Sequence, residues 1–237
     1  MDGILAAQLA QEGFESATHL LELTNGLLDS FIQDRAAEVP PMDFDARWEL
    51  LRNGYKPYAS CRATHASIQA ARALAPRLTG RTITRVHAKV HPNAVVTAGK
   101  MNPRTPLECK FSVPFCIALG LSGYRLVASE FTEATFKDAA VTGLLPLIEL
   151  EVVKDQAQYE AHLEVTLEGG EVVRGDVDIV LGHAQNPMSE ADFETKFTGL
   201  VEPVLGKPRC AELHGLLNGF ERPGSLRKVM QLLAADK

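Results

Sequence analysis

The spacing of apolar residues predicts helices at both ends of the chain and a middle region that mixes helices with strands. The first segment, DGILAAQLAQEGF, has helical spacing, and Gly13 is placed to end the helix. TGRTITRVHAKVH alternates polar and apolar residues, as a half-buried strand does. From Pro187 onward the spacing is helical again, and Ser189 begins a capping-box variant with an acid at the third helical position.

Three further strands and several helices are predicted between these ends. LIELEVV, EAHLEVTL and EVVRGDVDIV have strand patterns, and Gly169-Gly170 between the last two indicates a hairpin. One helix follows Thr64 and runs to about Leu78, a buried helix begins around Leu107, and another spans TEATFKDAAVTGLL. The predicted fold class is α+β, with a mainly antiparallel sheet.

The Pro-rich segment AAEVPPMDF predicts a domain boundary. We expect residues 1–45 to be helical and linker, 46–185 to form a small α+β lid domain, and 186–237 to be helices that pack against the first ones. Neither helical end looks like a complete domain. The first helix is almost entirely small and apolar, which favours neighbours on more than one side. We therefore expect a larger partner, or a missing part of the same all-α domain, to cover it.

Composition excludes some classes of function. The net charge of −6 argues against a nucleic-acid-binding protein, which normally has a basic stripe. No apolar run is long enough to span a bilayer, so we expect no membrane contact. The 4 cysteines have neither CxxC nor zinc-finger spacing, and reduced thiols favour a cytoplasmic protein. We expect no metal and no cofactor.

The stretch YKPYASCRATH, residues 55–65, combines cations with hydroxyls at the start of a helix. Lys56 precedes a proline, which holds its backbone extended, while Ser60 can bond backbone amides near the helix start. Arg62 and His65 lie at the positive end of the helix dipole, which attracts carboxylates. The segment is either a carboxylate pocket in which Lys56 or His65 moves protons, or an ordinary helix cap with solvated charges. Taken alone, it favours the cap.

A second segment, NPRTPLECKFS, places Arg104 and Lys110 at the entrance of another buried helix. Two cationic, hydroxyl-rich loops of this kind suit a ligand with several carboxylates. We therefore predict that Lys56, Arg62 and His65 face the same concave surface as Arg104 and Lys110.

These two segments resemble the MmgE/PrpD family, which includes 2-methylcitrate dehydratase, cis-aconitate decarboxylase and iminodisuccinate epimerase. The resemblance covers YKPYASCRATH, NPRTPLECKFSVPFCIALGL, GILAAQLAQEGF and PMSEADFETKF, and thus essentially the whole chain. It implies a large all-α domain and a smaller α+β lid with the active site between them. Roughly the first half of a typical member would be absent here.

The resemblance also implies roles for single residues. Lys56 matches the lysine of the lid that lines the family's active site. Cys61 matches a position that is histidine in the decarboxylase branch, and Phe115 matches a tyrosine that contributes to catalysis there. These two departures speak against cis-aconitate decarboxylation. The candidate catalytic residues are then Lys56, Cys61 and His65. The candidate substrate-binding residues are Ser60, Arg62, Arg104, Lys110 and Phe115.

Two functional readings follow. In the first, the chain is a 2-methylcitrate dehydratase-like lyase of propionate metabolism that acts on a di- or tricarboxylate, or a related epimerase or isomerase. In the second, it is a non-catalytic lid subunit or truncated homologue. We expect a homodimer or a partner α-domain subunit, and weak or no activity from this chain alone.

Overall fold

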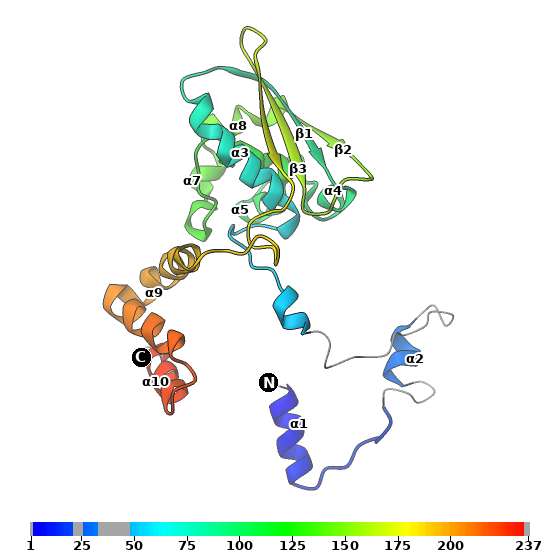
Figure 1. Ribbon diagram of the computed structural model, residues 1–237, viewed down its shortest axis with the longest axis vertical. Coiled ribbons are helices and arrows are strands. Elements are labelled where there is room, and N and C mark those ends of the chain that lie inside the picture. The colour runs from blue at the N-terminus through cyan, green and yellow to red at the C-terminus, as the bar shows by residue number, and fades with distance from the viewer. Residues whose placement is uncertain (1, 21–25, 33–47, 235–237) are drawn as a thin grey trace. The chain divides into compact units, whose positions relative to one another are not determined.

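The computed structural model describes residues 2–20, 26–32 and 48–234 (Figure 1). The predicted linker AAEVPPMDF and part of the helical stretch before Asn25-Gly26 lie outside these residues. The chain divides into two units, Met1–Trp48 and Glu49–Lys237.

The first unit contains two helices, α1 (Asp2–Gln11) and α2 (Leu27–Phe31). All residues of α1 are exposed within the chain. The helix ends as its sequence predicts. Gly13 takes a φ of 85°, and the amides of Gly13 and Phe14 donate to the carbonyls of Ala10 and Leu9. This left-handed termination needs glycine because a Cβ would be strained there.

The second unit is built on a four-stranded sheet, which confirms the α+β class. Its strands are β1 (Ile83–Val90), β2 (Ile148–Val152), β3 (Ala161–Leu167) and β4 (Val172–Val177). They lie in the order β2-β1-β3-β4. The β1–β3 and β3–β4 pairs are antiparallel, whereas β1 and β2 are parallel. The sheet is therefore mainly antiparallel, and the predicted β3–β4 hairpin forms with positive φ at both Gly169 and Gly170.

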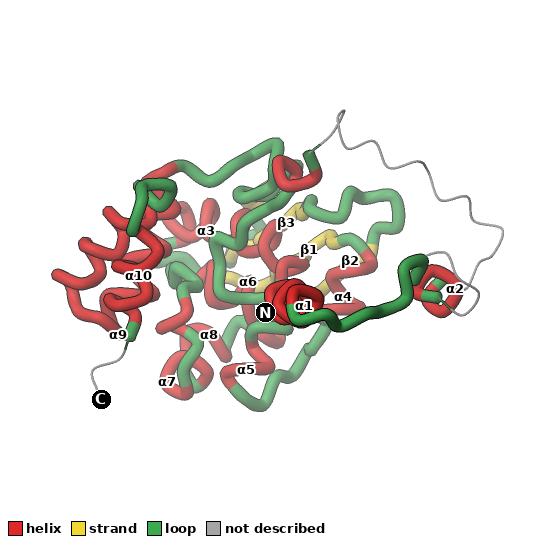
Figure 2. Tube along the Cα trace, turned by 90° about the horizontal axis from the view of Figure 1, so that it is seen from below, coloured by secondary structure: helices red, strands yellow, loops and turns green. Residues whose placement is uncertain are grey.

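Two helices cover one face of the sheet, α3 (His65–Leu78) and α6 (Val113–Leu121), as the ribbon and tube views show (Figures 1 and 2). The crossing of α3 and α6 is tight, since a Cβ on Gly120 would lie 2.8 Å from the Cβ of Ala71. The alternation of β1 is as predicted, with Val86, Ala88 and Val90 buried against these helices.

Short helices connect these elements. They are η1 (Glu49–Arg52), η2 (Arg62–Thr64), α4 (Pro92–Ala98), α5 (Pro106–Cys109), η3 (Ala128–Glu130), α7 (Glu133–Phe136), α8 (Ala139–Thr142) and η4 (Leu145–Leu147). The helix predicted from Leu107 is thus two helices, α5 and α6, because Ser112 caps a new start by accepting from the amide of Phe115. TEATFKDAAVTGLL is likewise two helices, since Asp138 caps α8.

The chain ends in two helices, α9 (Glu190–Asn218) and α10 (Ser225–Leu233), which contact each other. The predicted capping box is confirmed: the Ser189 hydroxyl accepts from the amide of Asp192, whose carboxylate accepts from the amide of Ser189. Gly206, with a φ of 75°, interrupts α9 between Pro203 and Pro208. The part of α9 that precedes this kink forms one wall of the pocket described below.

Candidate functional site

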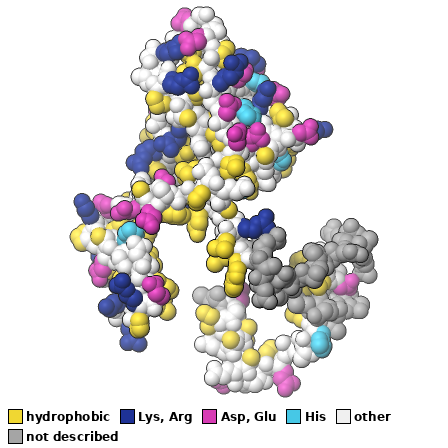
Figure 3. Space-filling model, in the orientation of Figure 1, with side chains coloured by type: hydrophobic (Ala, Val, Ile, Leu, Met, Phe, Trp, Pro, Cys, Tyr) yellow, Lys and Arg dark blue, Asp and Glu magenta, His cyan; other side chains and the backbone are white. Residues whose placement is uncertain are grey.

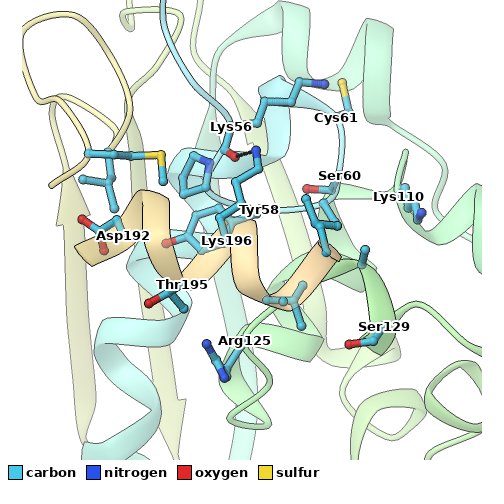
Figure 4. Close-up of a pocket in the computed structure, with 18 of the residues that line it drawn as sticks. Lys56, Tyr58, Ser60, Cys61, Lys110, Arg125, Ser129, Asp192, Thr195 and Lys196 are labelled. Carbon is cyan, nitrogen blue, oxygen red and sulfur yellow. Dashed lines mark hydrogen bonds between the residues drawn. The ribbon is translucent and has the colours of Figure 1, made fainter. Parts of the chain in front are cut away.

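A pocket of about 720 Å³ lies between the segment 56–61, the loops after α5 and α6, and the first part of α9 (Figure 4). Its polar lining consists of cations, hydroxyls, a thiol and one carboxylate. These residues are Lys56, Tyr58, Ser60, Cys61, Arg72, Lys110, Arg125, Ser129, Asp192, Thr195 and Lys196. Such a volume is typical of a small-molecule site.

The two segments that the sequence analysis singled out meet at this pocket. The amide of Cys61 donates to the carbonyl of Lys110 at 2.8 Å, which joins the end of α5 to the segment before α3. The Ser60 and Thr64 hydroxyls lie 2.8 Å apart, and Thr64 donates to the carbonyl of Cys61. Thr64 occupies the N-cap position of α3, but its hydroxyl fixes this turn and caps no amide.

Positive charge dominates the pocket. The lining contains one carboxylate, that of Asp192, and five cationic side chains: Lys56, Arg72, Lys110, Arg125 and Lys196. Among the described residues, no carboxylate lies within ion-pair distance of any of these five cations. Cations that converge without local counterions are the arrangement that binds an anionic ligand, because the ligand then supplies the missing charge.

Two of the cations lie over aromatic rings. The Arg72 guanidinium lies 5.6 Å from the centre of the Tyr58 ring, and the Lys110 ammonium lies 5.4 Å from that of Phe131. Cation–π contacts hold a charged group without neutralising it. Neither contact supplies a counterion, so a ligand carboxylate can pair with Arg72 and Lys110.

The pocket brings together four of the predicted site residues, Lys56, Ser60, Cys61 and Lys110. Its lining leaves out Arg62, His65, Arg104 and Phe115.

Arg62 is turned away from the pocket by its own contacts. It donates to the carbonyl of Tyr55 and lies 5.3 Å from the centre of the Tyr159 ring. Arg104 is exposed beyond the pocket, where its backbone amide donates to the carboxylate of Glu108. The spacing of these two arginines in the sequence does not reveal in which direction their long side chains extend.

Phe115 lies in the core, with 1% of its surface exposed. The helix α6 is apolar all round and buried along its length, so no position on it faces solvent. Phe115 packs against Phe136, with ring centres 6.3 Å apart. Cys116, predicted to be a core residue, is fully buried in the same helix, and burial raises the pKa of its thiol to about 12.

His65 lies beneath the pocket and is fully buried. Its Nε2 contacts the Ser60 carbonyl at 3.4 Å, and its ring packs edge-on against Tyr58. Its Nδ1 has no hydrogen-bond partner in the described structure. Burial, together with the nearby charges of Arg62, Lys56 and Lys196, lowers the pKa of His65 to about 3. The imidazole is thus neutral at physiological pH and attracts no carboxylate.

The first part of α9 supplies the residues that sequence reasoning missed. Asp192, Thr195, Lys196 and Gly199 recur at three- and four-residue intervals, so one face of the helix lines the pocket. Hydrogen bonds from Ser189 hold the pKa of Asp192 below its usual range. In the sequence Asp192 is recognisable only as a cap, and nothing local associates α9 with residues 56–61.

Arg72 and Arg125 were missed for a similar reason. Arg72 lies on α3, one helical turn after Ile68, and reads as an exposed polar position of an amphipathic helix. Arg125 follows α6 in a loop. Each is an ordinary surface charge until the fold places it beside the other cations.

Other kinds of site find less support in the part of the chain that the structure describes. No three His, Cys, Asp or Glu side chains cluster there as metal ligands would. No helix in the described ranges combines the length and the apolar character needed to cross a membrane.

Comparison with known proteins identifies the domain that carries this pocket. No match was found among curated proteins. The family model of the MmgE/PrpD C-terminal domain matches residues 58–216, which is more than half of the chain and contains all but two of the residues that line the pocket. We conclude that the chain belongs to the MmgE/PrpD family.

Proposed function

We propose that the chain binds a di- or tricarboxylate in this pocket and is a 2-methylcitrate dehydratase-like lyase of propionate metabolism. The observation that supports this most is the set of five cations that have no carboxylate partner among the described residues. Each carboxylate of a ligand gains charge-assisted hydrogen bonds there, which are stronger than neutral ones. A hydroxyl-bearing polycarboxylate also suits Ser60, Ser129 and Thr195, whose hydroxyls both donate and accept.

The proposed reaction is elimination of water from a hydroxy-polycarboxylate. It needs a base for the C–H next to a carboxylate, an acid for the leaving hydroxyl, and cations that stabilise the enolate-like intermediate. We assign proton transfer to Lys56, with Cys61 beside it, and carboxylate binding to Lys110 and Arg125. His65 is buried and neutral, and its role in this proposal is to support the Ser60 turn.

Turnover by this chain alone is expected to be slow or absent. The only carboxylate in the described lining, Asp192, is held by Ser189, and its lowered pKa makes it a weak base. A positioned acid or base typically contributes on the order of a hundredfold to ten-thousandfold in rate. A non-catalytic lid subunit that needs a separate α-domain partner, or an epimerase or isomerase that uses only the proton-abstraction step, are the alternatives.

The test combines binding with turnover. Isothermal titration calorimetry with citrate and with tricarballylate, which lacks the hydroxyl, is expected to show binding of both in roughly the millimolar range. Absorbance of the unsaturated product measures dehydration of citrate or 2-methylcitrate. Absence of binding at high millimolar ligand would overturn the proposal. Robust turnover that disappears in Lys56→Ala would show that the chain needs no further catalytic groups.

Two further elements of the proposal concern context. Gel filtration with a measured mass distinguishes a homodimer from a monomer, and co-purification tests for an α-domain partner. A cytoplasmic location fits the four cysteines, all of which are free thiols.

A further inference from the structure

Lys196 differs from the other cations of the pocket in its surroundings. It reaches from α9 to the segment before α3, where its Nζ donates to the backbone carbonyl of Lys56 (Figure 4). Lys196 is partly buried, whereas Lys56 is exposed. One hydrogen bond to a carbonyl fixes the direction of the side chain and leaves the rest of the nitrogen facing the pocket.

The surroundings of Lys196 disfavour its ammonium form. Burial lowers its pKa, and the charge of Lys56 lowers it further. The carboxylate one turn earlier on α9, Asp192, is occupied by Ser189 and makes no ion pair with Lys196. A lysine that is desolvated next to another cation is the kind that reacts as a neutral amine.

We propose that Lys196 is a nucleophilic amine that forms a Schiff base with a 2-oxo dicarboxylic acid bound in the pocket. The proposal rests on the carboxylate-binding function proposed above, because the remaining cations must hold the two carboxylates while the keto carbon lies against Nζ. It adds a covalent site and a carbonyl-bearing ligand class to that function.

The step balances without an oxidant or a metal. The nitrogen lone pair of Lys196 attacks the keto carbon, and a proton moves from nitrogen to the former carbonyl oxygen to give a carbinolamine. That hydroxyl takes up a second proton, supplied by solvent, and leaves as water while the C=N bond forms. The positive charge of the resulting iminium is balanced by the carboxylates of the ligand.

Reductive trapping tests this chemistry and does not depend on turnover. The protein is incubated with 2-oxoglutarate and cyanoborohydride, which reduces the imine to a stable secondary amine. Trypsin does not cleave after a modified lysine, so the adduct joins residues 175–196 to the segment that follows. Mass spectrometry of this peptide is expected to show on the order of tenfold more adduct at Lys196 than at Lys207, because a bound ligand has a high effective concentration.

Lys207 is the matched control, since it is an exposed lysine of the same helix that lies beyond the Gly206 kink and outside the pocket lining. Excess citrate should suppress the adduct at Lys196 and leave that at Lys207 unchanged. Lys196→Arg should abolish the adduct at this position and leave that at Lys207 unchanged, and circular dichroism checks that the variant folds.

Equal labelling of all exposed lysines, or labelling concentrated at Lys56, would overturn the assignment. If citrate binds by calorimetry but no adduct forms at Lys196, the Schiff-base proposal fails and the carboxylate pocket stands. If neither is observed, both proposals fail.

Discussion

Charged side chains are frequent both in the pocket and on the face of the sheet that α3 and α6 do not cover, which we call the open face. The two regions differ in how these charges are paired. On the open face arginines lie against carboxylates, such as Arg85 beside Glu149 and Arg174 with its Nε 2.7 Å from Glu164. Figure 3 shows basic, acidic and histidine side chains intermingled over the part of the molecule where the strands lie in Figure 1. In the pocket the five cations have no such partner among the described residues. An anion site therefore depends on which counterions are missing, and the number of cations alone does not reveal it.

Two histidines show the same contrast. His162 projects from β3 on the open face, where Nδ1 lies 2.8 Å from Asp176 and Nε2 lies 2.7 Å from Glu160. These carboxylates raise the pKa of His162, Asp176 most. His65 lies beneath the pocket, without a carboxylate, and its pKa is lowered to about 3. The same residue type thus titrates in opposite directions on the two sides of one domain.

The largest effect that tests this comparison is expected from charge reversal in the pocket. The double variant Lys110→Glu/Arg125→Glu should lower citrate affinity more than about a hundredfold, because hydrogen bonds to charged groups are worth roughly 1.5–3 kcal/mol each. Calorimetry measures the affinity. The reversal Arg174→Glu on the open face is the control and should leave citrate binding unchanged. Similar losses in both variants would mean that net charge, and not the pocket, attracts the ligand.

A smaller effect is expected on the free energy of unfolding at acid pH, where His65 is protonated in the unfolded chain but not in the folded one. Because its folded-state pKa is depressed, its stabilising contribution is complete above pH ~6.5 and is lost as the pH falls towards about 3. Between pH 7 and pH 5 the free energy of unfolding should fall by about 2 kcal/mol on this account.

Urea unfolding at both pH values measures that loss. His65→Leu cannot be protonated and should lose correspondingly less stability on acidification than the unaltered chain. Equal acid sensitivity of the two proteins would show that His65 is protonated without cost in the folded state.

The smallest effect should come from His162, with the opposite sign. Its raised pKa means that its contribution is present below the unfolded-state value of about 6.5 and is lost as the pH rises through the folded-state value. Since the pairs are on the surface, the contribution should be below about 1 kcal/mol. His162→Gln should remove a small gain of stability between pH 8 and pH 6, measured by thermal unfolding. A loss of several kcal/mol would indicate that the open face is covered in solution.

Much of the fold could be predicted because it depends on local patterns. The alternation in residues 83–90, the paired glycines at 169 and 170, and the Ser189 capping box each specify a backbone conformation without reference to distant residues. The missed features also had local causes. Ser112 and Asp138 divide predicted helices in two, because a well-placed cap stabilises a new helix start as readily as it begins an isolated one.

Only half of the predicted site residues line the pocket. Lys56, Ser60, Cys61 and Lys110 occur in short segments whose composition marks them, and they do line the pocket. Arg62 and Phe115 occur in the same segments and do not, since the direction of a side chain depends on what the segment packs against. Composition identified the loops but not which side chains face inward.

By itself the sequence determined the class of the fold, its hairpin, its caps and the two cationic loops, because each depends on residues close together in the chain. Only the tertiary structure placed Arg72, Arg125, Asp192 and Lys196 at the same pocket. The structure also showed that His65 is buried. It showed in addition that the Lys196 amine donates to the carbonyl of Lys56, 140 positions away in the chain. Electrostatic character depends on distances through space and on exclusion of water, and neither is encoded in sequence spacing.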